Sequence, residues 1–171
     1  WFVQKLDEAG YRGVRLAMKT DQEPAIVALK KAVAAARVGE SAFIESPVKC
    51  SRANGMIERA VRTWEGQLRT AKHHLETMMK KKYDEDHVIM QWMAMWVSEL
   101  IIKFREASHG KTAYEEMTGH RCKHKVVPFG EFVNFKLEPG KTNKKVMESH
   151  WGTGIFVGVI SRTTEYLVMN K

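Results

Sequence analysis

The sequence predicts an α/β fold that is followed by a small all-β module. Residues 14–45 read as strand, helix, strand, the order of a βαβ crossover between parallel strands. A long amphipathic helical pattern starts at Met56, and after residue 108 the apolar residues form short runs separated by Gly, Pro and Lys, which predict strands. We therefore expect a domain at 1–108, a linker with a short helix at 109–128 and a basic β-module at 129–171.

The predicted crossover starts after a short helix that ends near Gly10. Residues 14–18 alternate as in a strand, and Asp21 follows directly. The helix that comes next has Pro24 in its first turn, where a missing N–H costs nothing, and continues to about Arg37. Residues 42–45 form the second strand.

The long helix is predicted to follow a loop at 46–53, with Asn54 as its N-cap. Its apolar residues keep one face at helical spacing over about 25 residues. These residues are Ile57, Ala60, Val61, Trp64, Leu68, Ala71, Leu75 and Met78.

A second helix is predicted from His87 to about Arg105. It is apolar nearly all round, so it is either core or a partner surface. The run at 88–104 carries Glu99 and is shorter than the roughly 20 apolar residues of a membrane span. We expect no membrane span, and we expect a homo-oligomer to form through helix 88–104.

A capping box predicts one more short helix, because Thr112 is followed three residues later by Glu115. Gly119 ends this helix. The strands of the β-module are predicted at 132–137, 154–160 and 164–169.

Charge and cysteine usage narrow the class of protein. The formal net charge is +8 and the pI is about 9.5, which favours nucleic acid as a partner, with an anionic membrane surface as the second choice. A hydrophobic content of 44% argues against wholesale disorder. Cys50 and Cys122 form no CxxC pair, so we expect a reducing, intracellular compartment and not a disulfide framework.

Two acids are candidate metal ligands. Asp21 ends a strand and Glu58 lies in the first turn of the long helix, so a crossover between them can bring both to one divalent cation. One or two carboxylates, with water and phosphate oxygens, satisfy Mg²⁺. The alternative is that Asp21 is a turn residue and Glu58 an acid favoured by the helix dipole.

Basic side chains surround Glu58. They can clamp the phosphates of a nucleic acid beside the metal. Arg62 lies four residues after Glu58, so the alternative is an ordinary helical ion pair. The candidate phosphate-binding residues are Lys49, Arg52, Arg59, Arg62, Arg69 and Lys72.

The segment His120-x-Cys122-x-His124 offers zinc ligand types. Its spacing is not that of a structural zinc site and no second ligand pair accompanies it, so a basic loop is the preferred interpretation.

Several of these motifs together resemble a known family. Thr20-Asp21-Gln22-Glu23 and Asn54-Gly55-Met56-Ile57-Glu58-Arg59 are similar to the second half of the integrase catalytic core of copia-like and gypsy-like retroelements and retroviruses. The 36 residues between the two acids are close to the gap usual in that family. Residues 112–119, Phe129-Gly130 and Trp151-x-x-Gly154-Ile155-Phe156-Val157-Gly158 resemble the segments that follow the core in such polyproteins.

The resemblance implies a partial RNase H-like core with extra helices, followed by an SH3-like module. It implies Mg²⁺- or Mn²⁺-dependent 3′-end processing and DNA strand transfer, with Asp21 and Glu58 as the second and third metal-binding acids. Asn54 would join the basic residues in binding DNA, whereas Glu65 stands where the family often has a cation. The location would be nuclear if the element is eukaryotic.

The first acid of the family's D…D…E triad has no counterpart here. We therefore expect this chain to be a fragment that is inactive alone. The alternative is a non-catalytic DNA-binding or assembly remnant of a transposable element.

Overall fold

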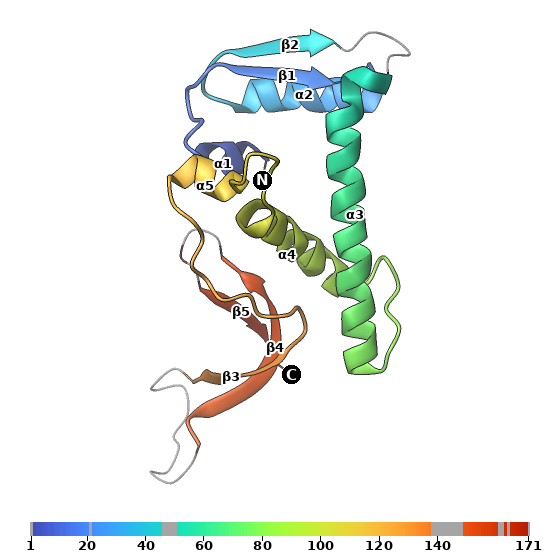
Figure 1. The fold of residues 1–171 in the computed structure, drawn as a ribbon, viewed down its shortest axis with the longest axis vertical. Coiled ribbons are helices and arrows are strands. Elements are labelled where there is room, and N and C mark those ends of the chain that lie inside the picture. Colours follow the sequence, from blue (N-terminus) through green and yellow to red (C-terminus); the bar gives the residue numbers. More distant parts are fainter. Residues whose placement is uncertain are drawn as a thin grey trace. The chain divides into compact units, whose positions relative to one another are not determined.

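A computed structural model describes residues 2–20, 22–45, 51–137, 149–160, 163 and 165–170, with the side chains of 51–54 left out. The protein is mixed α/β and divides into two compact units, Trp1–Thr63 and Trp64–Lys171 (Figure 1). One helix, α3 (Ser51–Met79), continues from the first unit into the second. The predicted boundaries near residues 108 and 128 both fall inside the second unit.

The first unit contains the predicted βαβ crossover. Its two strands are parallel, with register from Leu16↔Ser41 to Thr20↔Glu45, so the predicted parallel pair is confirmed. The first strand starts and ends two residues later than the alternation predicts. The elements are α1 (Phe2–Glu8), β1 (Leu16–Thr20), α2 (Pro24–Ala36) and β2 (Ser41–Glu45).

Arg37 joins the end of α2 to the loop before β1 and to the start of β2. Its guanidinium donates to the carbonyl oxygens of Tyr11 at 3.3 Å and Val14 at 2.8 Å, and to Ser41 Oγ at 3.0 Å. The residue is only 8% exposed. Its charge is therefore compensated by backbone and hydroxyl oxygens, as a buried cation requires.

Helix α3 starts earlier than predicted. It begins at Ser51 and has 29 residues, so the loop predicted over 51–53 and the N-cap predicted at Asn54 are both wrong. Asn54 and Gly55 lie inside the helix. Their low helix propensity, about 1 kcal/mol for Gly, is too small to set the boundary when helix-forming residues flank them.

Two helices of the second unit have side-chain caps. Helix α4 (Val88–Phe104) is capped by His87 Nδ1, which accepts from Ile89 N at 3.2 Å. Helix α5 (Ala113–Thr118) is capped by Thr112 Oγ1, which accepts from Glu115 N at 3.1 Å. The left-handed Gly119, with φ 78°, follows α5. The predicted cap and stop of this helix are confirmed.

A three-stranded antiparallel sheet completes the second unit, in the order β3 (Phe132–Lys136), β4 (Trp151–Val159), β5 (Tyr166–Met169). Its inner face packs on α4, where the rings of Trp96 and Phe156 meet edge to face at 5.1 Å. Trp64 Nε1 on α3 donates to Ser98 Oγ on α4 at 3.0 Å. The sheet thus shares one core with the helices, formed by Leu75, Ile89, Met90, Met93, Trp96, Val97, Phe129, Phe156 and Val157.

Within the described residues, no helix is both long enough and apolar enough to cross a lipid bilayer.

Candidate nucleic-acid interface

The first turns of α3 place Glu58 and Arg62 on one helix face. Arg62 Nη2 lies 3.6 Å from Glu58 Oε2, and the two side chains are 73% and 48% exposed. Arg59 turns back along the helix, where its Nε donates to the carbonyl oxygen of Gly55 at 3.2 Å. The structure therefore brings together an exposed acid and two exposed cations within the first unit.

Apolar side chains accompany this charged group. Met56, Ile57 and Val61 are 81%, 62% and 48% exposed. The apolar stripe predicted along α3 is therefore covered only in its later part, where Leu68, Ala71 and Leu75 pack in the core of the second unit.

Some of the residues predicted around Glu58 lie outside the part of the chain that the structure describes. Asp21 and Lys49 lie outside the described residues, and so do the side chains of Arg52 and Asn54. The predicted convergence of Asp21 and Glu58 stays a prediction.

Glu58 by itself fits one position of a magnesium site. It is a half-exposed carboxylate with Arg62 Nη2 at 3.6 Å from its Oε2, and Mg²⁺ requires one or two such groups besides water and phosphate oxygens. In the described part of the chain, no three His, Cys, Asp or Glu side chains are grouped closely enough to hold a metal ion.

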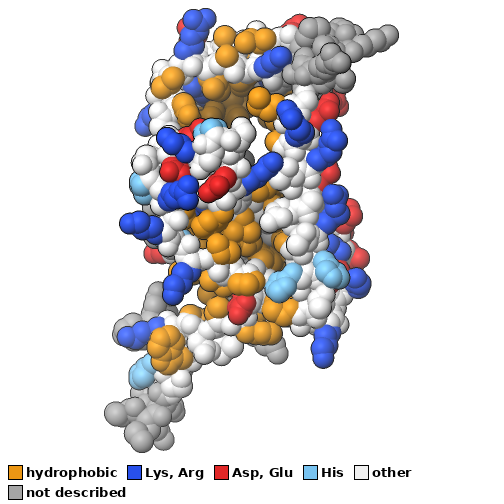
Figure 2. All heavy atoms as spheres, in the orientation of Figure 1, with side chains coloured by type: hydrophobic (Ala, Val, Ile, Leu, Met, Phe, Trp, Pro, Cys, Tyr) orange, Lys and Arg blue, Asp and Glu red, His pale blue; other side chains and the backbone are white. Residues whose placement is uncertain are grey.

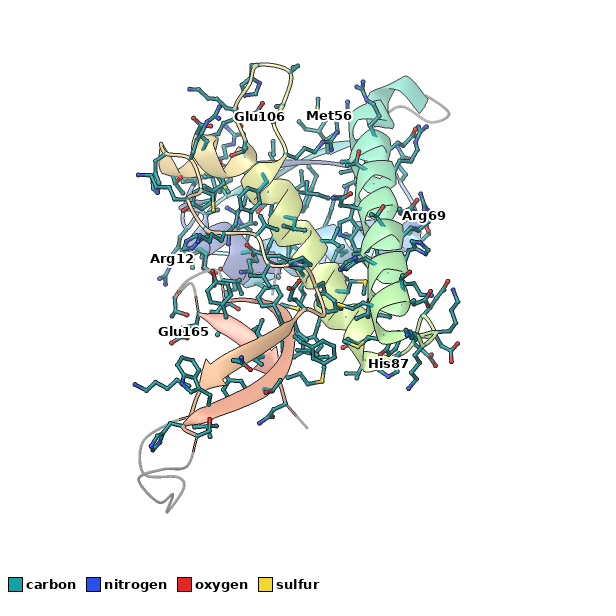
Figure 3. The ribbon with its side chains drawn as sticks, turned by 60° about the horizontal axis from the view of Figure 1, so that its bottom comes forward. Arg12, Met56, Arg69, His87, Glu106 and Glu165 are labelled. Atoms are coloured by element: carbon teal, nitrogen blue, oxygen red, sulfur yellow. The ribbon has the colours of Figure 1, made fainter. Side chains whose placement is uncertain are left out.

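Farther along α3, ion pairs follow at helical spacing. Arg69 Nη1 lies 3.8 Å from Glu65 Oε2, and the two side chains are 72% and 48% exposed. Figure 3 shows Arg69 pointing outward from α3, and Figure 2 shows Lys, Arg, Asp and Glu side chains interspersed along the edge formed by this helix. Glu65 thus already neutralises part of the charge that Arg69 offers to a phosphate.

The end of α3 holds a buried acid that the sequence analysis missed. Glu76 is 7% exposed. Its Oε1 lies 2.7 Å from Lys72 Nζ and accepts from Tyr83 N at 3.0 Å, and its Oε2 accepts from Lys82 Nζ at 2.9 Å. These bonds lower the pKa of Glu76 from 4.5 to about 2, and the bond from Lys72 has the largest effect.

The signal for this cluster was present in the sequence. Lys72 and Glu76 are four residues apart, and a run of lysines follows at 80–82. The structure shows that one of its lysines folds back onto the acid, because a buried carboxylate needs cationic and N–H partners.

The His120–Cys122–His124 segment lies in a loop after α5. His120 Nδ1 is 3.0 Å from the carbonyl oxygen of Thr118, and its ring meets Tyr114 edge to face at 5.7 Å. Cys122 is a free thiol.

Helix α4, the predicted oligomer surface, has an exposed apolar face. Val88, Trp92, Met95 and Ile102 are 58%, 38%, 48% and 38% exposed. Their positions are four, three and seven residues apart, which is one or two helical turns, so they share one face. Whether a second copy covers that face stays a prediction.

No family model, curated protein or solved structure matches this chain.

Proposed function

We propose that this chain is the C-terminal part of a retroelement-type integrase and that it binds duplex DNA through α3. The observation that carries the proposal is the start of α3, where Glu58, Arg59 and Arg62 lie exposed directly after a parallel strand–helix–strand crossover. An acid among cations at such a place suits a metal ligand beside a phosphate backbone. The net charge of +8 has the sign that this partner requires.

The finer assignments are part of the same proposal. The first unit would be a portion of an RNase H-like core, and β3–β5 would belong to an SH3-like module. Asp21 and Glu58 would hold Mg²⁺ or Mn²⁺, whose Lewis acidity would activate a water or a DNA 3′-hydroxyl. The residues of this chain would bind and orient the phosphates.

DNA binding is tested with single charge-removing variants of the 171-residue chain. Arg59→Gln, Arg62→Gln and Arg69→Gln should each weaken binding of a fluorescein-labelled duplex and lower the salt slope of log K by about 0.9. Fluorescence anisotropy at several salt concentrations measures both quantities. Arg12→Gln is the matched control, because Arg12 is an exposed arginine outside α3.

Equal effects of Arg12→Gln and the three α3 variants would show that only net charge matters, and would refute binding through α3. Catalysis needs a separate test in the full-length protein, by Mg²⁺-dependent joining of a DNA end to a plasmid. Glu58→Gln should abolish joining and leave duplex affinity unchanged or raised. Undiminished joining would exclude Glu58 as a metal ligand, and DNA binding without any joining in the unmodified protein would favour a non-catalytic remnant.

A further inference from the structure

The three-stranded sheet has one face that α4 does not cover. Strand residues alternate between the two faces, and Phe156 on the inner face is 1% exposed against α4. The residues on the opposite side form the outer sheet face. They are Phe132, Asn134 and Lys136 of β3, Trp151, Thr153 and Ile155 of β4, and Leu167 and Met169 of β5, with the registers Phe132↔Ile155, Asn134↔Thr153, Lys136↔Trp151 and Ile155↔Met169. Ile155 and Leu167 also pack against the core, so the open part of the face lies around Phe132, Trp151 and Met169.

Large apolar side chains are exposed on this face. Phe132 is 63% exposed and Trp151 is 59% exposed, and Met169 adds a third apolar side chain at 38%. A single exposed apolar residue is ordinary. Here two aromatic rings and a methionine are exposed on one face of a three-stranded sheet, which makes that face a candidate binding surface.

The spacing of the two rings sets what they can hold. Phe132 lies opposite Ile155, which is four residues from Trp151 on β4, so the two rings are roughly 14 Å apart along the strand. Stacked rings have centroids about 4.5–7 Å apart, so one planar group cannot stack on both. The polar pair between them, in which Thr153 Oγ1 donates to Asn134 Oδ1 at 3.2 Å, separates two stacking positions.

The charge of the outer sheet face fits an anionic ligand. Lys136 lies directly opposite Trp151 on the neighbouring strand. No Asp or Glu occupies an outward position among the described residues of the three strands. Figure 2 shows hydrophobic, Lys or Arg, and His side chains together over this end of the sheet.

We infer that the outer sheet face binds single-stranded DNA, with separate bases stacked on Phe132 and Trp151 and a phosphate beside Lys136. This inference rests on the proposed function, in which the chain handles DNA. Duplex DNA would not use the two rings, because its bases are already stacked on one another. Aromatic platforms next to cations are the usual means of holding unpaired bases without reading their sequence.

The test compares Trp151→Ala and Phe132→Ala with Tyr11→Ala by anisotropy of fluorescein-labelled oligothymidine. Tyr11 is the control because it is an exposed aromatic residue, 42% accessible, that lies outside the sheet and outside α4. Trp151→Ala should weaken binding about tenfold, Phe132→Ala should act similarly, and Tyr11→Ala should have no effect. Lys136→Gln should lower the salt slope of log K by about 0.7. Circular dichroism checks that each variant is folded.

An abasic oligonucleotide of the same length separates stacking from charge. It should bind the unmodified protein more weakly than oligothymidine does, and Trp151→Ala should cause no further loss. An equal loss on the abasic strand would overturn the inference, as would equal effects of Trp151→Ala and Tyr11→Ala. A change from dimer to monomer in sedimentation on Trp151→Ala would also overturn it, because the face would then be a subunit interface.

The two proposals fail separately. If duplex DNA binds through the arginines of α3 while oligothymidine binding is insensitive to Trp151, only the inference about the sheet is wrong. If the unmodified protein binds neither form of DNA, both proposals are wrong.

Discussion

Gly130→Ala should strongly destabilise the second unit, because two independent costs coincide at this residue. Residues 128–131 form a tight turn in which Glu131 N donates to the carbonyl oxygen of Pro128 at 3.2 Å. Gly130 has φ +86°, as the third residue of a type II turn requires. An added Cβ would lie 2.4 Å from Leu75 Cδ1 and 3.0 Å from Met78 Cε.

The magnitude follows from those two terms. A left-handed conformation costs a non-glycine residue about 1–2 kcal/mol. Leu75 is fully buried at 0% exposure, so it cannot move away freely, and overpacking a core typically costs about 1–3 kcal/mol. We expect Gly130→Ala to lower the free energy of unfolding by about 3 kcal/mol, a large fraction of a typical domain stability of about 5–15 kcal/mol.

Urea denaturation measures this loss, with Gly110→Ala as the matched control. Gly110 lies in the same unit and has φ +81°, but an added Cβ there would meet nothing within 4 Å. The control should show only the conformational cost. Placing Gly130→Ala in a Leu75→Val background, which removes the obstructing Cδ1, should reduce its cost to that of the control. Equal destabilisation by Gly130→Ala and Gly110→Ala would refute the steric argument.

Two further outcomes follow from the buried charges. The pKa of Glu76 is lowered to about 2, chiefly by the hydrogen bond from Lys72. The stability that ionised Glu76 contributes is therefore complete above about pH 4.5 and is lost as the pH falls toward 2. In urea titrations, Glu76→Gln should lose less stability between pH 5 and pH 3 than the unmodified protein does, and an equal loss would contradict this. Arg37→Met should remove the part-buried hydrogen bonds that the guanidinium donates to the carbonyl oxygens of Tyr11 and Val14 and to Ser41 Oγ, and should cost the first unit about 2 kcal/mol, seen as faster amide exchange in β1 and β2. Arg15→Met should have little effect because the Arg15 side chain is 69% exposed, and equal exchange in both variants would exclude the role of Arg37.

The elements that the sequence predicts well are those with short-range signals. The capping box at Thr112 and the left-handed Gly119 mark the two ends of α5, a helix of six residues. The parallel pair of β1 and β2 follows from the order strand, helix, strand, because a crossover of this kind connects parallel strands. The first signal lies within a few residues and the second in the order of three consecutive elements, and tertiary packing overrides neither of them here.

The features that the sequence does not predict depend on tertiary contacts or on summed weak preferences. The start of α3 at Ser51 is set by the whole helix and not by the unfavourable Asn54 and Gly55. Helical periodicity places Ile57 and Leu75 on the same stripe, yet one is 62% exposed and the other 0%. Periodicity defines a face but does not say which neighbour covers it. The Glu76 cluster needs a backbone reversal after α3, which local preferences do not specify.

The ion pairs of α3 determine which of its cations are available to a phosphate. Arg62 and Arg69 pair with exposed acids at 3.6 and 3.8 Å, and such surface pairs contribute at most about 1 kcal/mol, so a phosphate can replace either acid at little cost. Lys72 Nζ instead lies 2.7 Å from the carboxylate of Glu76, which is only 7% exposed. If Lys72 moved away to bind a phosphate, the buried Glu76 would lose one of its two cationic partners. All three cations lie on one helix, but they differ in the burial of the acid that each one pairs with. In the proposed DNA complex, Arg62 and Arg69 would contact phosphates, whereas Lys72 would hold the end of the helix.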